Sequence, residues 1–168
     1  MHTRTKTALI VVSASLMTMT GCAAGSAEAK EVTNGPSPVP ANTIPEQQVE
    51  ALFDEWNASL ATGDPAKVDA MYAADAVLLP TVAPGVHDTS AERVGYFTAF
   101  LQNDPTGTVD EGVVRPLGPN AVSHSGLYSF TMGTTGEVVK ARFTFVYERI
   151  NGEWKIVEHH SSKEPAAK

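Results

Sequence analysis

Two runs of alternating residues, joined by an Asn-Gly pair, form the end of this chain and constrain its fold more than any other feature. The runs cover residues 141–147 and 154–162, and Asn151 and Gly152 lie between them. Asn-Gly readily adopts the positive φ angles of a type I′ turn, so the pattern predicts an antiparallel β-hairpin. Alternation along the first strand separates two faces, with Arg142, Thr144 and Val146 on one and Phe143, Phe145 and Tyr147 on the other.

The residues before this hairpin predict helices first and strands afterwards. Apolar residues at helical spacing predict helices that begin near Thr43, Asp64 and Thr89, and Thr43 and Thr89 each open a capping box. Strands are expected at residues 75–80, 108–115, 121–131, 138–150 and 154–161. This order is typical of an α+β domain, in which N-terminal helices pack on a strongly bent antiparallel sheet and leave a cone-shaped cavity.

The first residues do not belong to that domain. Arg4 and Lys6 precede a mostly apolar run at residues 8–19, which is the pattern of a secretory signal peptide and is too short to span a bilayer. Residues 19–22, Met-Thr-Gly-Cys, resemble a bacterial lipobox, and a segment rich in Pro, Gly, Ser and Thr follows. We therefore divide the chain into a signal peptide with a lipobox (1–22), a flexible linker (23–43) and one folded domain (44–165).

Cysteine usage agrees with the lipobox. Cys22 is the only cysteine of the chain, so no internal disulfide can form, and acylation would remove a reactive exported thiol. The sequence predicts a lipoprotein of the bacterial cell envelope, held in the membrane by acyl chains such as palmitate and facing the periplasm or the exterior. The alternative is cleavage after Ala27-Glu28-Ala29, which would give a soluble periplasmic or secreted protein.

The charge balance argues against several classes of partner. The chain has a net charge of −7, and loss of the signal peptide with Arg4 and Lys6 leaves 10 basic against 19 acidic residues. No basic cluster is present, so binding to nucleic acid or to anionic lipid through charge is not expected. The predicted link to the membrane is the lipid anchor alone.

Several segments of the domain resemble a known family. They are Trp56-Asn57, Gly63-Asp64, Tyr72, residues 75–80, Gly126-Leu127-Tyr128, residues 141–147 and residues 154–162. Together they look like the bacterial proteins similar to the association domain of calcium/calmodulin-dependent protein kinase II. That family lies in the nuclear transport factor 2-like superfamily, which is also called cystatin-like or SnoaL-like.

The resemblance implies a cone with a deep pocket and no kinase activity. The association domain assembles the kinase and is not itself catalytic. This chain has no Gly-rich loop, His-Arg-Asp or Asp-Phe-Gly motif, so no kinase function is expected. Relatives in the wider superfamily catalyse isomerisation, cyclisation or dehydration, and some close bacterial relatives are labelled oxidoreductases, but a shared fold does not choose between activities.

Arg142 is the first candidate for ligand binding. By analogy with the association domain, whose pocket arginines lie on the last long strands, Arg142 and Thr144 are expected to face the cavity. A partly buried arginine there would bind a carboxylate, because a guanidinium forms bidentate, charge-assisted hydrogen bonds with one. An exposed or internally paired arginine is the alternative reading.

Histidines and aromatic residues complete the expected pocket. His159 and His160 are neighbours on one strand and point to opposite faces. His159 is expected in the cavity, although a histidine bonded within the sheet or at an interface fits the sequence equally well. The four aromatic candidates for the walls are Trp56, Tyr72, Tyr96 and Tyr128, for which simple core packing is the alternative. The histidines show no metal-ligand spacing, and no cofactor motif is present.

Two function classes remain. The first is an oligomeric, lipid-anchored domain that binds a small polar or carboxylate-bearing molecule without catalysis. The second is a cofactor-free SnoaL-like enzyme, an isomerase, cyclase, dehydratase or labelled oxidoreductase, using general acid–base chemistry in the same pocket. A homodimer or larger oligomer is expected in either case, because a face carrying Phe143, Phe145 and Tyr147 needs cover from water.

Overall fold

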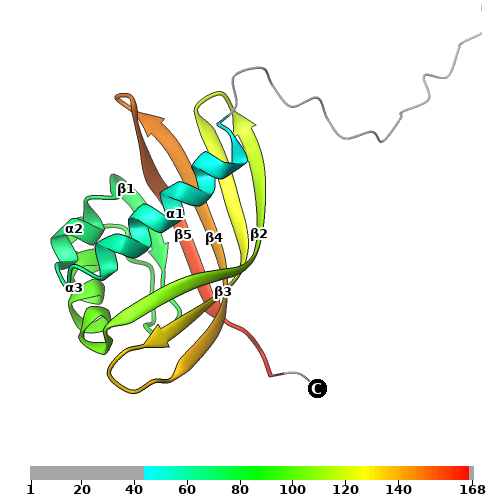
Figure 1. Ribbon diagram of the computed structural model, residues 1–168. Helices are drawn as coiled ribbons and strands as arrows, with labels where there is room; N and C mark the ends of the chain where they lie inside the picture. Colours follow the sequence, from blue (N-terminus) through cyan, green and yellow to red (C-terminus); the bar gives the residue numbers. More distant parts are fainter. Residues whose placement is uncertain (1–43, 167–168) are drawn as a thin grey trace, which may run out of the picture. The chain divides into compact units, whose positions relative to one another are not determined.

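The computed structural model describes residues 44–166, which form one domain of helices packed on a curved sheet (Figure 1). The elements, in chain order, are α1 (Glu46–Leu60), α2 (Pro65–Asp69), β1 (Tyr72–Leu79), α3 (Ser90–Phe100), a 3₁₀ turn η1 (Leu101–Asn103), β2 (Pro105–Gly118), β3 (Ala121–Met132), β4 (Val138–Ile150) and β5 (Glu153–Lys163). The predicted signal peptide, lipobox and linker lie outside the described residues. No helix within residues 44–166 is long and apolar enough to cross a membrane.

The five strands form a single open sheet in the order β1-β5-β4-β3-β2. Strands β2 to β5 are joined by antiparallel pairing, as predicted, whereas β1 pairs with β5 in parallel. Parallel pairing requires a long crossover, and the chain supplies one through α3 and the three strands that follow. The α+β cone is therefore confirmed, with a mixed sheet in place of the all-antiparallel one.

The helices begin where local hydrogen bonding favours it. Thr89 and Glu92 form the predicted capping box of α3, in which each side chain accepts from the other residue's backbone N–H. The side chain of Asp64 caps α2 by accepting from Ala66 N. At α1 the N-cap is Pro45 and no side chain caps the helix. The predicted box at that end depends on Thr43, which lies outside the described residues.

The last hairpin turns as the sequence predicted. Asn151 and Gly152 have φ angles of 53° and 90°, both positive, between the paired strands β4 and β5. This geometry favours Asn-Gly because glycine has no Cβ and asparagine tolerates the left-handed region. The turn sets the pairing as far as Tyr147 with Ile156. A register shift between Tyr147 and Val146 then brings Phe145 opposite His159, and Arg142 opposite Ser162.

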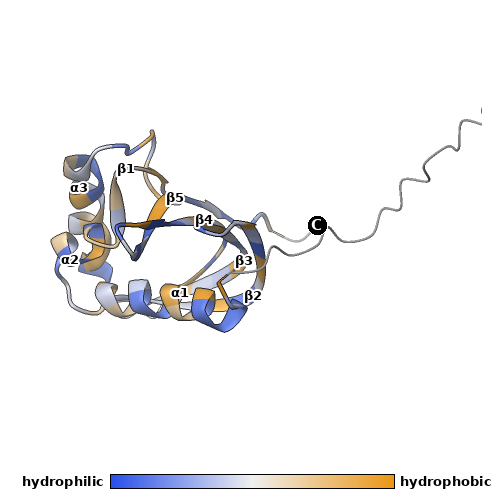
Figure 2. Ribbon diagram, turned by 90° about the horizontal axis from the view of Figure 1, so that it is seen from above, coloured by the Kyte–Doolittle hydropathy of each residue, from blue (hydrophilic) through white to orange (hydrophobic). Residues whose placement is uncertain are grey.

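Helix α1 lies across the concave side of the sheet (Figures 1 and 2), where it contacts the aromatic side chains of β4. Phe53 of α1 stacks near Phe143 with ring centroids 6.3 Å apart, and Trp56 meets Phe145 edge to face at 5.2 Å. Tyr147 is also buried. The expectation that this aromatic face needs a second subunit is therefore wrong, because the chain's own helix buries it.

Asn57 joins α1 to the edge strand β2. Its Nδ2 donates to Gly107 O at 3.0 Å, and its Oδ1 accepts from Gly107 N at 2.8 Å. A Cβ on residue 107 would lie 3.0 Å from the Phe130 ring and 3.1 Å from Asn57 Oδ1. Because helix and strand approach each other this closely, a side chain at residue 107 would require Phe130 or Asn57 to shift, and glycine avoids that.

Candidate functional site

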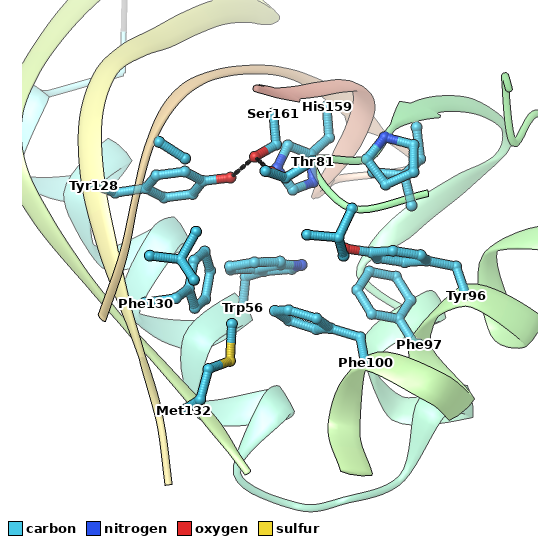
Figure 3. Close-up of a pocket in the computed structure, with 15 residues that line it drawn as sticks. Trp56, Thr81, Tyr96, Phe97, Phe100, Tyr128, Phe130, Met132, His159 and Ser161 are labelled. Carbon is cyan, nitrogen blue, oxygen red and sulfur yellow. Dashed lines mark hydrogen bonds between the residues drawn. The ribbon is translucent and has the colours of Figure 1, made fainter. Parts of the chain in front are cut away.

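A small cavity lies between α1, α3 and the inner face of the sheet (Figure 3). Its apolar walls include Trp56, Tyr96, Phe97, Phe100, Phe130 and Met132, and its polar side chains are Thr81, Tyr128, His159 and Ser161. The volume open to the centre of a water molecule is about 20 Å³, which is close to the least that holds one water. An organic ligand would need part of the wall to move.

His159 occupies the inner face of β5 and is held by a chain of hydrogen bonds. Trp56 Nε1 donates to Tyr72 Oη at 3.1 Å, and Tyr72 Oη lies 2.8 Å from His159 Nδ1. The imidazole also stacks on Phe145 with ring centroids 4.0 Å apart. All four side chains are buried, so the position of His159 is fixed from two sides.

The hydrogen-bond chain indicates one tautomer of His159. Tyr72 Oη already accepts from Trp56, so its single proton is satisfied if it donates to His159 Nδ1. Nδ1 is then the acceptor, and the ring proton is on Nε2. His159 Nε2 is buried and has no hydrogen-bond partner among the described residues. The cavity wall therefore contains one N–H donor that needs an acceptor.

A second polar group in the wall consists of three hydroxyls. Tyr128 Oη donates to Ser161 Oγ, and Ser161 Oγ is hydrogen-bonded to Thr81 Oγ1 (Figure 3). Ser161 lies two residues after His159, so both side chains point to the inner face of β5. The polar side of the cavity is therefore built on β5, opposite the aromatic side chains of α3.

Burial keeps these groups uncharged at neutral pH. Burial, with a smaller contribution from His160, lowers the pKa of His159 to about 3. Burial also raises the pKa of Tyr128 to about 12, against the hydrogen bonds to Ser161 and Thr81 that lower it. The pKa of Tyr72 lies well above its ordinary value for the same main reason. The cavity thus offers hydrogen bonds without a fixed charge.

Four of the seven predicted ligand-binding residues line the cavity: Trp56, Tyr96, Tyr128 and His159. Tyr72 lies behind His159 and orients it. The expected orientation of Arg142 and Thr144 is wrong. They lie on the outer face of the sheet with His160 and Ser162, and Arg142 is exposed. The aromatic residues that alternate with them take the inner face, because α1 packs there.

The sequence reasoning missed Thr81, Ser161 and Arg93. Ser161 shares its strand face with His159, a signal that was present in the alternation. Arg93 is buried, and its Nε lies 2.7 Å from Asp69 Oδ1. Its Nη atoms donate to the carbonyls of Ala76 at 2.7 Å and Ala73 at 3.1 Å. These bonds attach α3 to α2 and β1. Helical spacing contains no signal for them.

A second hollow lies between α1 and β2 and is strongly acidic. Glu50, Asp54, Asp110 and Glu111 line it, with His124 among the wall residues. Within residues 44–166 no group of His, Cys, Asp or Glu side chains is arranged to hold a metal ion. The hollow is open to solvent and lies apart from the His159 cavity.

Comparison with known proteins identifies first the fold class of this domain and then its family. The helices on one side of a bent sheet, with a cavity between them, define a nuclear transport factor 2-like, or cystatin-like, domain, and solved proteins of both descriptions match the structure. Residues 45–165 match the profile of the calcium/calmodulin dependent protein kinase II association domain. The chain belongs to this association domain family.

Solved structures support the assignment at two levels of similarity. An association domain protein of this family from Xanthomonas campestris is 41% identical, covers 77% of this chain and 100% of its own, and has a TM-score of 0.71. A Streptomyces avermitilis protein named a dehydratase of the nuclear transport factor 2-like family is 17% identical over 71% of this chain and 96% of its own, with a TM-score of 0.59.

A third structure, from Novosphingobium aromaticivorans and named an aromatic ring hydroxylase, is 17% identical over 74% of this chain and 94% of its own, with a TM-score of 0.62. The last two similarities concern the fold alone. No curated protein sequence matches the chain.

Proposed function

We propose that the cavity binds a small, mainly apolar, neutral molecule that carries a hydrogen-bond acceptor, without catalysis. The observation that supports this most directly is His159 Nε2, a buried donor with no partner among the described residues, in a wall that is otherwise largely aromatic and aliphatic. A buried donor without an acceptor costs free energy, about 1–3 kcal/mol. A ligand oxygen placed there would remove that cost while its apolar body contacts the aromatic side chains.

The position of Arg142 changes the expected ligand class. A carboxylate needs a cation when it leaves water, and the residues that line the cavity include no lysine or arginine. His159 does not supply the charge, because burial holds its pKa at about 3. A neutral carbonyl or hydroxyl group fits this wall better than an acid.

The alternative is a SnoaL-like enzyme that uses the same cavity. The names of the dehydratase and hydroxylase structures and the free Nε2 of His159 favour it. General acid–base catalysis needs a group that changes protonation near the working pH. The cavity lining includes no aspartate, glutamate or lysine, and His159 titrates far below neutrality, so binding is the better-supported function.

Calorimetry with a matched pair of small molecules tests the proposal. Cyclohexanone supplies an apolar body with a neutral acceptor, and cyclohexanecarboxylate supplies a similar body with a charge. We expect cyclohexanone to bind and the acid to bind at least about tenfold more weakly, since one charge-burial penalty exceeds 1.4 kcal/mol. His159→Phe should abolish the binding of cyclohexanone. Tighter binding of the acid, or equal binding by the variant, would refute the neutral-acceptor assignment.

We also propose that the protein forms oligomers through the outer face of its sheet. Membership in an association domain family supports self-association. Among the described residues no helix covers this outer face (Figure 2). A hollow on it is lined by Val113, Leu127, Arg142, Thr144 and His160. Light scattering of wild type and of Thr144→Arg tests this. A dimer that becomes monomeric in the variant supports the proposal, whereas a wild-type monomer at tens of micromolar contradicts it.

The third proposal concerns location. The apolar segment followed by Cys22 supports a lipid anchor that holds the protein at the bacterial cell envelope. The Cys22→Ser variant should move from the detergent phase to the aqueous phase on detergent partitioning, or remain unprocessed. Identical partitioning of the two proteins would exclude acylation at this residue.

A further inference from the structure

One wall of the cavity is the loop of residues 80–88, which connects β1 to α3. Pro80, Thr81 and Val82 from this loop line the cavity. The end of the loop is attached to β1, because Leu78 N donates to His87 O at 2.9 Å and His87 N donates to Leu78 O at 3.0 Å. Among the described residues, one hydrogen bond joins residues 80–86 to the rest of the domain, and it links Thr81 to Ser161.

The middle of this loop is apolar and exposed. Val82 is 64% exposed and Val86 is 55% exposed, although both are aliphatic. Val82 also lines the cavity, so it lies where the cavity meets solvent. Residues 81–86 belong to no helix or strand. The loop is therefore the part of the wall with the fewest attachments to the rest of the domain.

We propose that residues 80–88 are the gate of the cavity, and that a neutral alcohol opens it by replacing the hydroxyl of Thr81 on Ser161. This inference rests on the proposed function, because it names the ligand class and the entrance of the same site. The closed cavity has room for about one water molecule, about 20 Å³. A ligand of five or six carbons therefore enters only when a wall moves.

The hydrogen bonds of Ser161 suit a ligand hydroxyl. Ser161 Oγ accepts from Tyr128 Oη and has one proton to donate, and Thr81 Oγ1 is the partner that completes its hydrogen bonding. A ligand hydroxyl accepts this proton as Thr81 Oγ1 does, and like Thr81 it also has a proton of its own to donate, which a ketone lacks. The aliphatic body of the ligand then lies against Phe100 and Met132 on the opposite side.

Quenching of tryptophan fluorescence tests the gate without any ligand. Trp56 lines the cavity and is 1% exposed, so acrylamide reaches it only when the wall opens. The full chain with Trp154→Phe leaves Trp56 as the only tryptophan, because the chain has two. In this background Thr81→Val removes the hydroxyl and keeps the shape.

We expect Thr81→Val to raise the quenching constant of Trp56 roughly 2- to 10-fold, the effect of losing one neutral hydrogen bond on an opening equilibrium. Thr81→Ser should restore the wild-type value. Thr106→Val, at an exposed position of β2, is the matched control and should not change it. A quenching constant unaltered by Thr81→Val would overturn the gate.

Calorimetry with cyclohexanol tests the ligand class. The wild type should bind cyclohexanol, Thr81→Val should bind it roughly 2- to 10-fold more tightly because no hydroxyl competes for Ser161, and Ser161→Ala should bind it more weakly. No gain in Thr81→Val would overturn the displacement. The two proposals fail separately. If Thr81→Val raises the quenching of Trp56 but neither cyclohexanol nor cyclohexanone binds, the proposed function is refuted. If either molecule binds but the quenching does not change, the gate is refuted.

Discussion

The inner and outer faces of β4 and β5 are built from neighbouring residues but have opposite character. Phe143, Phe145 and His159 point inward, where α1 buries them, and Phe145 is 0% exposed. Arg142 and His160 point outward and are exposed. Alternation predicts which residues of β4 share a face, but it does not predict which face the helices cover. That choice follows from the aromatic residues of α1, which need large apolar partners. On β5 a register shift puts both Ile156 and His159 on the buried side.

Truncation of one residue on each face gives the largest expected difference. Phe145→Ala should lower the free energy of unfolding by about 3–5 kcal/mol, because it leaves a cavity among packed rings. The adjacent Thr144→Ala should change the unfolding free energy of the monomer by less than about 0.5 kcal/mol. Urea unfolding followed by circular dichroism measures both, and equal losses would mean that the outer face is also a packed core.

Two buried tyrosines sharpen the comparison within the inner face. Tyr72→Phe leaves Trp56 Nε1 and His159 Nδ1 without their partner, so we expect a loss of about 2–4 kcal/mol. Tyr147→Phe is the matched control, because the Tyr147 hydroxyl is buried and has no partner among the described residues. Thermal unfolding should show that this variant is as stable as the wild type or more stable. A stabilised Tyr72→Phe would refute the hydrogen-bond chain.

The buried histidine predicts a loss of stability in acid. His159 is neutral in the folded protein down to a pKa of about 3, whereas in the unfolded chain it takes a proton near pH 6.5. Between these two pKa values the unfolded state therefore binds more protons than the folded state. The contribution of His159 to stability falls as the pH falls through this window. The loss approaches about 1.4 kcal/mol per pH unit, or about 2–3 kcal/mol by pH 4.5.

Unfolding curves of the wild type and of His159→Gln between pH 7 and pH 4.5 check this prediction. The variant lacks the proton uptake of residue 159, so its stability should fall less steeply, whatever its value at pH 7. Parallel curves for the two proteins would show that His159 titrates alike in the folded and unfolded states.

Arg142→Ala should have the smallest effect. Because Arg142 is exposed on the outer face of the single protomer, we expect the unfolding free energy of the monomer to change by less than about 0.5 kcal/mol and the affinity for cyclohexanone to stay the same. Calorimetry and melting curves of the same protein sample measure both. Loss of cyclohexanone binding in this variant would mean that the outer face takes part in the site.

The elements of the fold could be predicted because their signals are local. The Asn151-Gly152 turn, the capping box at Thr89 and the length of β4 each depend on a few neighbouring residues. The site depends on contacts between distant residues. Thr81 meets Ser161 across 80 positions, and Tyr72 meets His159 across 87. No periodicity contains such pairs, and the parallel pairing of β1 with β5, which brings them together, has no local signal either.

Asn57 has a consequence for the solubility of this domain. Strand β2 is an edge of the sheet, and an edge exposes backbone groups on which foreign strands can grow into aggregates. The side-chain amide of Asn57 gives Gly107 one donor and one acceptor, the same pair that a neighbouring strand would offer. An aspartate at this position would present only acceptors and release the Gly107 carbonyl. At Gly107 the Asn57 amide therefore makes the two backbone hydrogen bonds that a sixth strand would otherwise make.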